Sequence, residues 1–257
     1  MLDDAQAHAF IEDGFIRIEN AFPRRLADEC REIIWRDLSA DPDDPATWPR
    51  PVAARPGYAQ APFLAAANTP RLHAAFDTLV GKDRWTPPAS LGGFVIRFPG
   101  GEPAAVDNWH VDVSFPGPAS DPYNYLTWRA NVASRDRALL MLFLLSDVAQ
   151  DDAPTRLRTG SHLDVARALE PEGEDGLDAI ELGRRAEAAS RHRPTAHATG
   201  SAGDVYLCHP FLVHAGQPHL GRHPRFLGQP KLDPSGPLRL DGGGSPVETA
   251  IRRALGR

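Results

Sequence analysis

Short β-strand patterns separated by glycine and proline fill most of the second half of the chain. In each pattern, apolar residues either alternate with polar ones or form a short continuous run bounded by turn-forming residues. The predicted strands cover residues 93–98, 109–115, 139–145 and 204–208. Many short strands separated by turns are typical of an antiparallel barrel or sandwich, so we expect a mainly β fold.

Helical patterns precede and interrupt these strands. Apolar residues recur at helical spacing over 3–13 and 24–38, and residues 14–18 between them alternate as a strand does. Residues 39–62 are rich in proline and lack periodicity, which predicts a long surface loop, either a plain connection or a lid. Residues 162–193 carry Ala, Leu, Glu and Arg at helical spacing and predict a helical insertion.

The length of 257 residues is sufficient for one large domain with a sizeable core. We expect a single domain over 1–257. Its expected parts are an N-terminal helical support and loop over 1–90, barrel strands over 91–160 and 200–240, and the helical insertion over 162–193.

Composition excludes several classes of partner. The chain has 28 Lys and Arg against 34 Asp and Glu, a net charge of −6, so no overall basic field attracts nucleic acid or an anionic membrane. The longest apolar run, 138–145, is far shorter than the roughly 20 residues of a membrane span, and a signal-peptide pattern is lacking. We therefore expect a soluble, cytoplasmic protein. Cys30 and Cys208 fit neither a disulfide framework nor a zinc site and are expected to be buried thiols.

The pattern His-x-Asp occurs twice, at His110–Asp112 and at His162–Asp164. Side chains two residues apart share a face in an extended strand, whereas on a helix they diverge. His110 and Asp112 lie in a strand pattern, so we expect them to point the same way. His162 opens a helical pattern behind Ser161, a candidate N-cap, so the second pair is expected to consist of surface and capping residues.

One imidazole and one carboxylate on a strand need a second histidine to form a 2-His-1-carboxylate site, which binds Fe(II) and leaves coordination positions open. The candidates follow the last predicted strand and are His209, His214, His219 and His223. A keto-acid cosubstrate on the iron needs its far carboxylate held, which a guanidinium does well. His214 and Arg225 lie eleven residues apart.

Four segments carry a further signal through their order along the chain. They are Phe10-Ile-Glu-Asp-Gly-Phe-Ile-Arg-Ile18 followed by Ala21-Phe-Pro, Trp109-His-Val-Asp112, Leu144-Leu-Ser-Asp-Val148 with Ala153-Pro-Thr-Arg-Leu-Arg-Thr-Gly-Ser-His162, and Gly203-Asp-Val-Tyr-Leu-Cys-His-Pro-Phe-Leu-Val-His214 with Arg225 beyond it. In this order they resemble the phytanoyl-CoA dioxygenase (PhyH-like) family of Fe(II)/2-oxoglutarate-dependent oxygenases. The resemblance runs through most of the chain.

The resemblance implies a set of site residues. His110, Asp112 and His214 match the iron ligands, and Arg225 matches the partner of the 2-oxoglutarate C5 carboxylate, with Arg222 as the alternative. No catalytic residue beyond the metal ligands is implied.

The chain also departs from the family's pattern. Many members carry a hydroxyl residue two positions after the distal histidine, where this chain has Gly216. Cosubstrate binding is therefore expected to depend more on Arg225 and on another donor, either Thr155 or Arg97.

The implied fold is a double-stranded β-helix, a cupin-like jelly-roll barrel with helices outside one sheet. The implied cofactors are Fe(II), 2-oxoglutarate as cosubstrate and O2, with 2-oxoglutarate decarboxylated to succinate and CO2 while a C–H bond of a small molecule is oxidised. Halogenating relatives replace the ligand carboxylate with a small residue, so the presence of Asp112 favours hydroxylation or a related oxidation over halogenation.

Aromatic residues beside the predicted metal ligands are candidates for a substrate pocket. Trp109, Phe115 and Trp128 are expected to line it, with burial in the core as the alternative. The candidate lids are the segments 39–62, 115–125 and 162–193.

Two other functions are compatible with the same residues. One is a cupin-like isomerase or hydrolase with zinc or manganese at the triad, which leaves Arg225 unexplained. The other is a non-catalytic small-molecule-binding protein on the same scaffold. No heptad pattern or apolar stripe indicates an oligomeric state.

Overall fold

The computed structural model describes residues 2–118, 120–121 and 123–257. The α-helices are α1 (Asp4–Asp13), α2 (Arg24–Leu38), α3 (Ala61–Ala67), α4 (Pro70–Leu79), α5 (Ser161–Leu169), α6 (Ala179–Ser190) and α7 (Pro246–Ala254). The 3-10 helices are η1 (Pro45–Thr47), η2 (Ala105–Asp107), η3 (Tyr125–Thr127) and η4 (Glu170–Glu172). The strands are β1 (Phe15–Ile18), β2 (Val52–Arg55), β3 (Phe94–Arg97), β4 (Phe115–Pro116), β5 (Trp128–Ala130), β6 (Leu139–Leu144), β7 (Arg156–Arg158), β8 (Leu177–Asp178), β9 (Thr195–His197), β10 (Val205–Cys208), β11 (His214–Ala215), β12 (Leu227–Gly228) and β13 (Lys231–Leu232).

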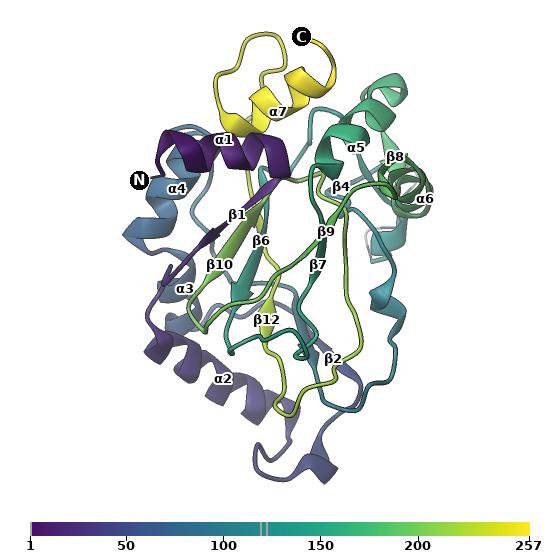
Figure 1. Cartoon of the computed structure of the whole chain (residues 1–257). Helices are drawn as coiled ribbons and strands as arrows, with labels where there is room; N and C mark the ends of the chain where they lie inside the picture. The colour runs from purple at the N-terminus through teal and green to yellow at the C-terminus, as the bar shows by residue number, and fades with distance from the viewer. Residues whose placement is uncertain (1, 119, 122) are drawn as a thin grey trace.

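Antiparallel pairing organises these strands into sheets. The major sheet has the order β1-β10-β6-β12-β3-β2, with β13 also paired to β6, and the minor sheet has the order β11-β7-β9. A peripheral sheet has the order β4-β5-β8. Helices α2, α3 and α4 lie along one side of the molecule, while α1 and α7 cover one end (Figure 1). The expected fold class, a mainly β jelly roll with flanking helices, is confirmed.

The central strand β6 explains why the longest apolar run of the sequence is uninterrupted. Successive side chains of a strand point to opposite faces of the sheet. Leu139, Met141 and Phe143 pack into the core beneath the helices, whereas Leu140 and Leu142 pack into a second cluster between the sheets. Both faces of β6 are therefore buried, which requires apolar residues at every position.

The predicted helices over 3–13 and 24–38 form as α1 and α2, and β1 lies between them. Asp3 caps α1 by accepting a hydrogen bond from the Gln6 backbone N–H at 2.8 Å. Gly14 ends α1 with a φ of +85°, a conformation that favours glycine. A Cβ at Gly14 would lie 2.4 Å from Nδ1 of His162, so close packing also requires glycine here.

The prediction of a plain loop over 39–62 is wrong in part. This segment contains η1 and β2, and α3 begins at Ala61. β2 pairs with β3 from Val52↔Arg97 to Arg55↔Phe94 and forms an edge of the major sheet. Four strand residues between two prolines are too few to show a period in the sequence.

The segment 109–115, predicted as one strand, pairs with two different partners. His110 forms an isolated bridge with His214, and Phe115 pairs with Arg129 of β5. The chain thus leaves the minor sheet for the peripheral sheet within six residues.

The segment 162–193 contains most of α5 together with η4, β8 and α6. Gly160, not Ser161, occupies the N-cap of α5, and the Ser161 hydroxyl accepts a hydrogen bond from the Val213 N–H at 2.9 Å. His162 was expected at the surface and is instead buried. Its Nε2–H donates to the Ile11 carbonyl at 3.0 Å, and its ring centroid lies 4.8 Å from that of His209. Helix α5 packs against α6 and α7, which the sequence pattern alone does not reveal.

Both cysteines are buried, as expected. In the described part of the chain, we find no helix that combines the length and apolarity needed to cross a membrane.

The buried His162 ring is expected to make the stability of the protein depend on pH. Burial lowers the pKa of His162 to about 4, although the hydrogen bond to Ile11 opposes the shift. The unfolded chain therefore binds more protons below pH 6.5, and the free energy of unfolding decreases as the pH falls from 6.5 towards 4. The expected loss is about 3 kcal/mol by pH 4.

Urea unfolding at pH 7.5 and pH 4.5 measures this loss. The neutral variant His162→Gln keeps a donor for Ile11 and is expected to show a smaller decrease in stability than the wild type. Equal decreases in both proteins would contradict this assignment.

Candidate metal and cosubstrate site

The residues His110, Asp112 and His214 converge at one point of the minor sheet. His110 and His214 face each other across the bridge, in which each backbone N–H donates to the other's carbonyl at 2.9 Å. Asp112 Oδ1 lies 3.8 Å from Nε2 of each histidine. All three ligand atoms lie within 4.8 Å of one another, a spacing at which they could share one metal ion.

Backbone carbonyls orient both imidazoles. Nδ1–H of His110 donates to the Asn108 carbonyl at 2.8 Å, and Nδ1–H of His214 donates to the Leu212 carbonyl at 3.0 Å. This arrangement leaves each Nε2 lone pair directed towards Asp112. Nε2 of His214 is buried and has no hydrogen-bond partner among the described residues. Such an unpartnered acceptor fits a metal ligand, whose other ring nitrogen is typically held by a carbonyl.

The protonation states of these groups also fit a metal. Burial acts to raise the pKa of Asp112, but the charge of Arg137, with His214 and His110, holds this pKa below its usual range. Burial and the adjacent His110 lower the pKa of His214 to about 4. At neutral pH the site therefore offers a carboxylate and a neutral imidazole, the forms that bind metal ions.

Arg137 is a site residue that the sequence did not indicate. Its Nη1 lies 3.3 Å from Asp112 Oδ2, and its Nη2 donates to the Val113 carbonyl at 3.1 Å and to the Tyr125 hydroxyl at 3.3 Å. The arginine therefore holds the carboxylate oxygen that faces away from the histidines. No local motif links Arg137 to Asp112, because the contact depends on how the chain folds back.

The other candidate histidines lie away from this point. His209 is buried against Val247, and Nε2–H of His219 donates to the His223 carbonyl at 2.8 Å. Of the histidines considered from the sequence as the third ligand, the structure brings His214 alone to His110 and Asp112.

A cavity of about 570 Å³ opens from the triad towards the surface. Arg97, Thr155 and Arg225 line it together with the triad, whereas Arg222 is exposed and lies outside the lining. Trp109 also lines the cavity. Phe115 and Trp128 do not line it. Phe115 is buried beneath Arg135, and the Trp128 ring packs against Tyr125 at a tilt of 41°.

Two of the three candidate lids reach this cavity. Tyr125 lines it from the segment 115–125, in which Ala119 and Pro122 lie outside the described residues. Helix α6 lines it from the segment 162–193, whereas no residue of 39–62 does so.

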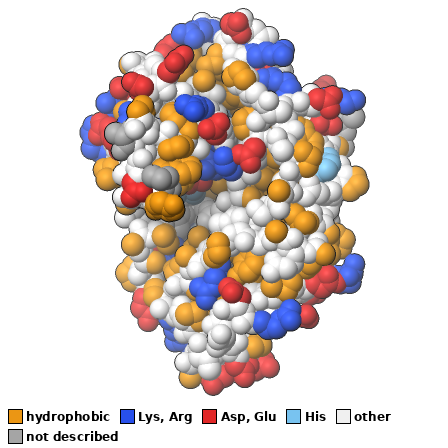
Figure 2. All heavy atoms as spheres, turned by 180° about the vertical axis from the view of Figure 1, so that it is seen from behind, with side chains coloured by type: hydrophobic (Ala, Val, Ile, Leu, Met, Phe, Trp, Pro, Cys, Tyr) orange, Lys and Arg blue, Asp and Glu red, His pale blue; other side chains and the backbone are white. Residues whose placement is uncertain are grey.

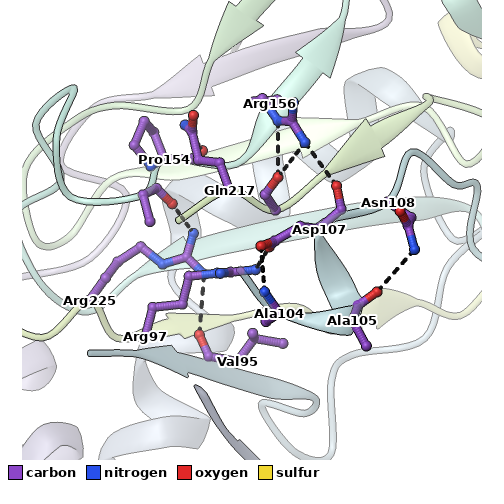
Figure 3. A network of polar contacts seen from close by, with 12 residues as sticks. Val95, Arg97, Ala104, Ala105, Asp107, Asn108, Pro154, Arg156, Gln217 and Arg225 are labelled. Atoms are coloured by element: carbon purple, nitrogen blue, oxygen red, sulfur yellow. Dashed lines mark hydrogen bonds and ion pairs between the residues drawn. The ribbon is translucent and has the colours of Figure 1, made fainter. Parts of the chain in front are cut away.

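Two buried arginines face each other on one side of the cavity. Arg97 and Arg225 form a bridge with mutual backbone hydrogen bonds of 2.8 and 3.0 Å. Arg97 pairs with Asp107, while Arg225 donates to the backbone carbonyls of Ala153 and Val95 (Figure 3). Burial and the charge of Arg97 lower the pKa of Arg225 to about 9.

The charges of this arginine pair are not balanced. Like charges on directly opposed strand residues destabilise a sheet, and Asp107 is the one acidic partner that these arginines have in the described structure. Nε of Arg97 and Nε of Arg225 are buried without hydrogen-bond partners among the described residues. An anionic ligand such as a carboxylate fits this position.

The side chains of Arg97 and Asp107 explain why position 216 is a glycine. A Cβ at this position would lie 2.1 Å from Nη2 of Arg97 and 2.7 Å from Oδ1 of Asp107. Arg156 donates to the Gly216 carbonyl from Nε at 2.9 Å and from Nη2 at 2.7 Å (Figure 3). The Arg97–Asp107 pair thus occupies the space into which a side chain at position 216 would extend.

The fold recurs in solved structures. HygX from Streptomyces hygroscopicus, crystallised with nickel, 2-oxoglutarate and hygromycin B, is 21% identical with a TM-score of 0.56 over 95% of this chain and 96% of that chain. The epimerase SnoN, in complex with Fe3+, alpha ketoglutarate and nogalamycin RO, is 16% identical with a TM-score of 0.62. The match covers 94% of this chain and 91% of that chain. EctD from S. alaskensis, with 2-oxoglutarate and 5-hydroxyectoine, is 21% identical with a TM-score of 0.57. The match covers 90% of this chain and 76% of that chain.

Sequence comparison gives two further results. A search of curated proteins finds no match. The model of the family described as phytanoyl-CoA dioxygenase (PhyH) matches residues 10–227, most of the chain. The chain therefore belongs to the phytanoyl-CoA dioxygenase family.

Proposed function

We propose that this protein is a non-haem Fe(II)/2-oxoglutarate-dependent dioxygenase that hydroxylates an unactivated C–H bond of a small molecule. The observation that carries this proposal is that one cavity joins two complementary sites. One is the triad with its His214 Nε2, and the other is the buried Arg225; among the described residues, the first has no hydrogen-bond partner and the second has no acidic partner. A metal ion fits the first site and the far carboxylate of a keto acid fits the second.

In this proposal His110, Asp112 and His214 hold the iron, and Arg225 holds the C5 carboxylate of 2-oxoglutarate. Thr155 and Arg97 line the same cavity and complete the cosubstrate site in this proposal. When loaded, such a centre supplies the oxidative decarboxylation of 2-oxoglutarate to succinate and CO2, coupled to reduction of O2 and oxidation of the substrate. The protein's own contribution is to hold the far carboxylate of 2-oxoglutarate and the reacting C–H bond of the substrate in place, and to keep water out of the site.

Arg137 supports hydroxylation as the outcome. By pairing with Asp112 Oδ2 it keeps the carboxylate in the ligand set, so that the coordination position of Asp112 is not open to a halide. Solved structures with this fold include an epimerase and a carbocyclase from nogalamycin biosynthesis, so the fold supports more than one reaction, and hydroxylation is the one that we propose.

Anaerobic titration of the metal-free protein with Fe(II) and then 2-oxoglutarate tests the proposal. We expect the weak visible charge-transfer band of an iron-chelated keto acid, which His214→Ala should remove. His223→Ala, an exposed histidine outside the cavity, is the matched control and should keep the band. Iron binding without a band would instead favour the isomerase or hydrolase. Failure to bind either would favour a non-catalytic binding protein.

A further inference from the structure

Tyr125 extends from the wall of the cavity to the backbone beside a metal ligand. It lies on η3, lines the cavity and is 45% exposed, and its neighbour Leu126 is also exposed and lines the cavity. On the face shown in Figure 2, hydrophobic side chains border a hollow. The Tyr125 hydroxyl donates a hydrogen bond at 2.5 Å to the carbonyl of Val113, the residue that follows Asp112. One side chain therefore contacts both the cavity and the segment that carries Asp112.

The same hydroxyl helps to orient the guanidinium of Arg137. Arg137 is buried, and Nη2 makes its hydrogen bonds within the described structure, to the Val113 carbonyl at 3.1 Å and to the Tyr125 hydroxyl at 3.3 Å. Its Nε and Nη1 are buried without hydrogen-bond partners among the described residues. Without the Tyr125 hydroxyl, Arg137 would keep one of these two hydrogen bonds and could turn about it.

The orientation of Arg137 decides how Asp112 faces the histidines. Nη1 of Arg137 lies 3.3 Å from Oδ2 of Asp112, whereas Oδ1 lies 3.8 Å from Nε2 of both His110 and His214. The arginine thus attracts one carboxylate oxygen and leaves the other directed towards the two imidazoles. Groups that contact a ligating carboxylate from behind orient it and contribute to metal affinity.

The Tyr125 side chain is suited to this contact because its phenol is neutral. Burial and the nearby charge of Asp112 raise the pKa of Tyr125 above its usual range. A neutral hydroxyl can accept from Arg137 while it donates to Val113. The ring packs separately, with its centroid 5.7 Å from that of Trp128. Removal of the hydroxyl alone therefore tests the contact without removing the ring.

We propose that Tyr125 is a positioning residue of the metal site: its hydroxyl fixes the guanidinium of Arg137 and thereby holds Asp112 with one oxygen directed towards the metal. This inference deepens the proposed function and rests on it for the binding of a metal at the triad. It also gives η3 a second role, since this short helix contributes both to the wall of the cavity and to the support of a ligand.

The variant Tyr125→Phe tests this proposal in the full-length protein. Co(II) is the probe, because its visible absorption reports the ligands and the geometry around the metal. We expect Co(II) affinity to fall about tenfold and the visible spectrum of the loaded protein to change. Thermal unfolding should change little, because the ring remains. Wild-type Co(II) affinity and an unchanged spectrum in Tyr125→Phe would overturn the proposal.

Tyr123→Phe is the matched control. It removes a phenol hydroxyl from the same segment, at a side chain that is exposed and does not line the cavity. Its Co(II) affinity and spectrum should equal those of the wild type. An effect at Tyr123 as large as that at Tyr125 would show that the site responds to any change in this segment, and would overturn the assignment to Tyr125.

A double-mutant cycle tests whether Tyr125 acts through Arg137. In the Arg137→Met background, Tyr125→Phe should change Co(II) affinity by less than about twofold, because the arginine that the hydroxyl positions is gone. Equal weakening in both backgrounds would show that Tyr125 acts by another route and would overturn the proposal. If Arg137→Met does not fold, Arg137→Lys serves as the background, since it keeps the charge without the planar fork.

These measurements separate the inference from the proposed function, because Co(II) binding requires neither 2-oxoglutarate nor turnover. Weaker Co(II) binding in Tyr125→Phe, in a protein whose wild type shows no iron–keto-acid band, would support the inference and refute the oxygenase function. A band in the wild type together with unchanged Co(II) binding in Tyr125→Phe would overturn the inference alone.

Discussion

Asp112→Ala is expected to lower the affinity for Fe(II) by more than about 100-fold and to abolish succinate formation from 2-oxoglutarate. The substitution removes the carboxylate of the triad, and it also leaves the buried guanidinium of Arg137 without its acidic partner. An uncompensated positive charge then lies beside the site of a metal cation, so the loss exceeds that of one ligand.

Calorimetry with Ni(II) as an air-stable substitute and an assay of succinate together measure this effect. Asp112→Asn keeps the shape of the side chain while removing its charge, and is expected to lose most of the metal affinity with little change in thermal unfolding. Metal affinity and succinate formation equal to the wild type in Asp112→Ala would refute the ligand assignment.

Arg225→Ala is expected to weaken 2-oxoglutarate binding by about 10- to 100-fold while leaving metal affinity nearly unchanged. A hydrogen bond to a charged group contributes about 1.5–3 kcal/mol, and 1.4 kcal/mol corresponds to a tenfold change in affinity. Arg97 cannot replace the lost charge, because it already pairs with Asp107.

Calorimetric titration of 2-oxoglutarate into Ni(II)-loaded protein measures this change, with Arg222→Ala as the matched control. Arg222 is exposed and lies outside the cavity lining, so its removal should have no effect. Arg225→Lys keeps the charge without the planar fork and should fall between the wild type and Arg225→Ala. A large effect at Arg222 with none at Arg225 would show that the cosubstrate anchor is misassigned.

The elements predicted well from the sequence are those whose burial pattern is local. β6 is a continuous apolar run because both of its faces are covered, and α2 carries buried residues at helical spacing. β2 was missed, because it forms by pairing with β3, whose residues lie 39 to 45 positions away in the sequence. The segment 109–115 pairs with two different sheets, and this could not be predicted from its alternating pattern, because both pairing partners lie elsewhere in the sequence.

The candidate site was predictable where side-chain direction follows from local geometry. His110 and Asp112 point the same way because they are two residues apart on extended chain, whereas the choice of His214 among four histidines depended on the family resemblance. Arg137 was not foreseen, since a single arginine carries no signal until the fold places it beside Asp112. Phe115 was expected in the pocket but serves the core, the commoner role of a strand aromatic.

The bridge between His110 and His214 joins segments more than a hundred residues apart in the sequence. A chain still being synthesised holds at most two of the three proposed ligands until His214 has emerged and the minor sheet has closed. Iron therefore has no complete binding site on the nascent chain, and loading follows folding instead of guiding it. This order keeps a redox-active metal away from the unfolded polypeptide, where uncontrolled reaction with O2 would oxidise the chain itself.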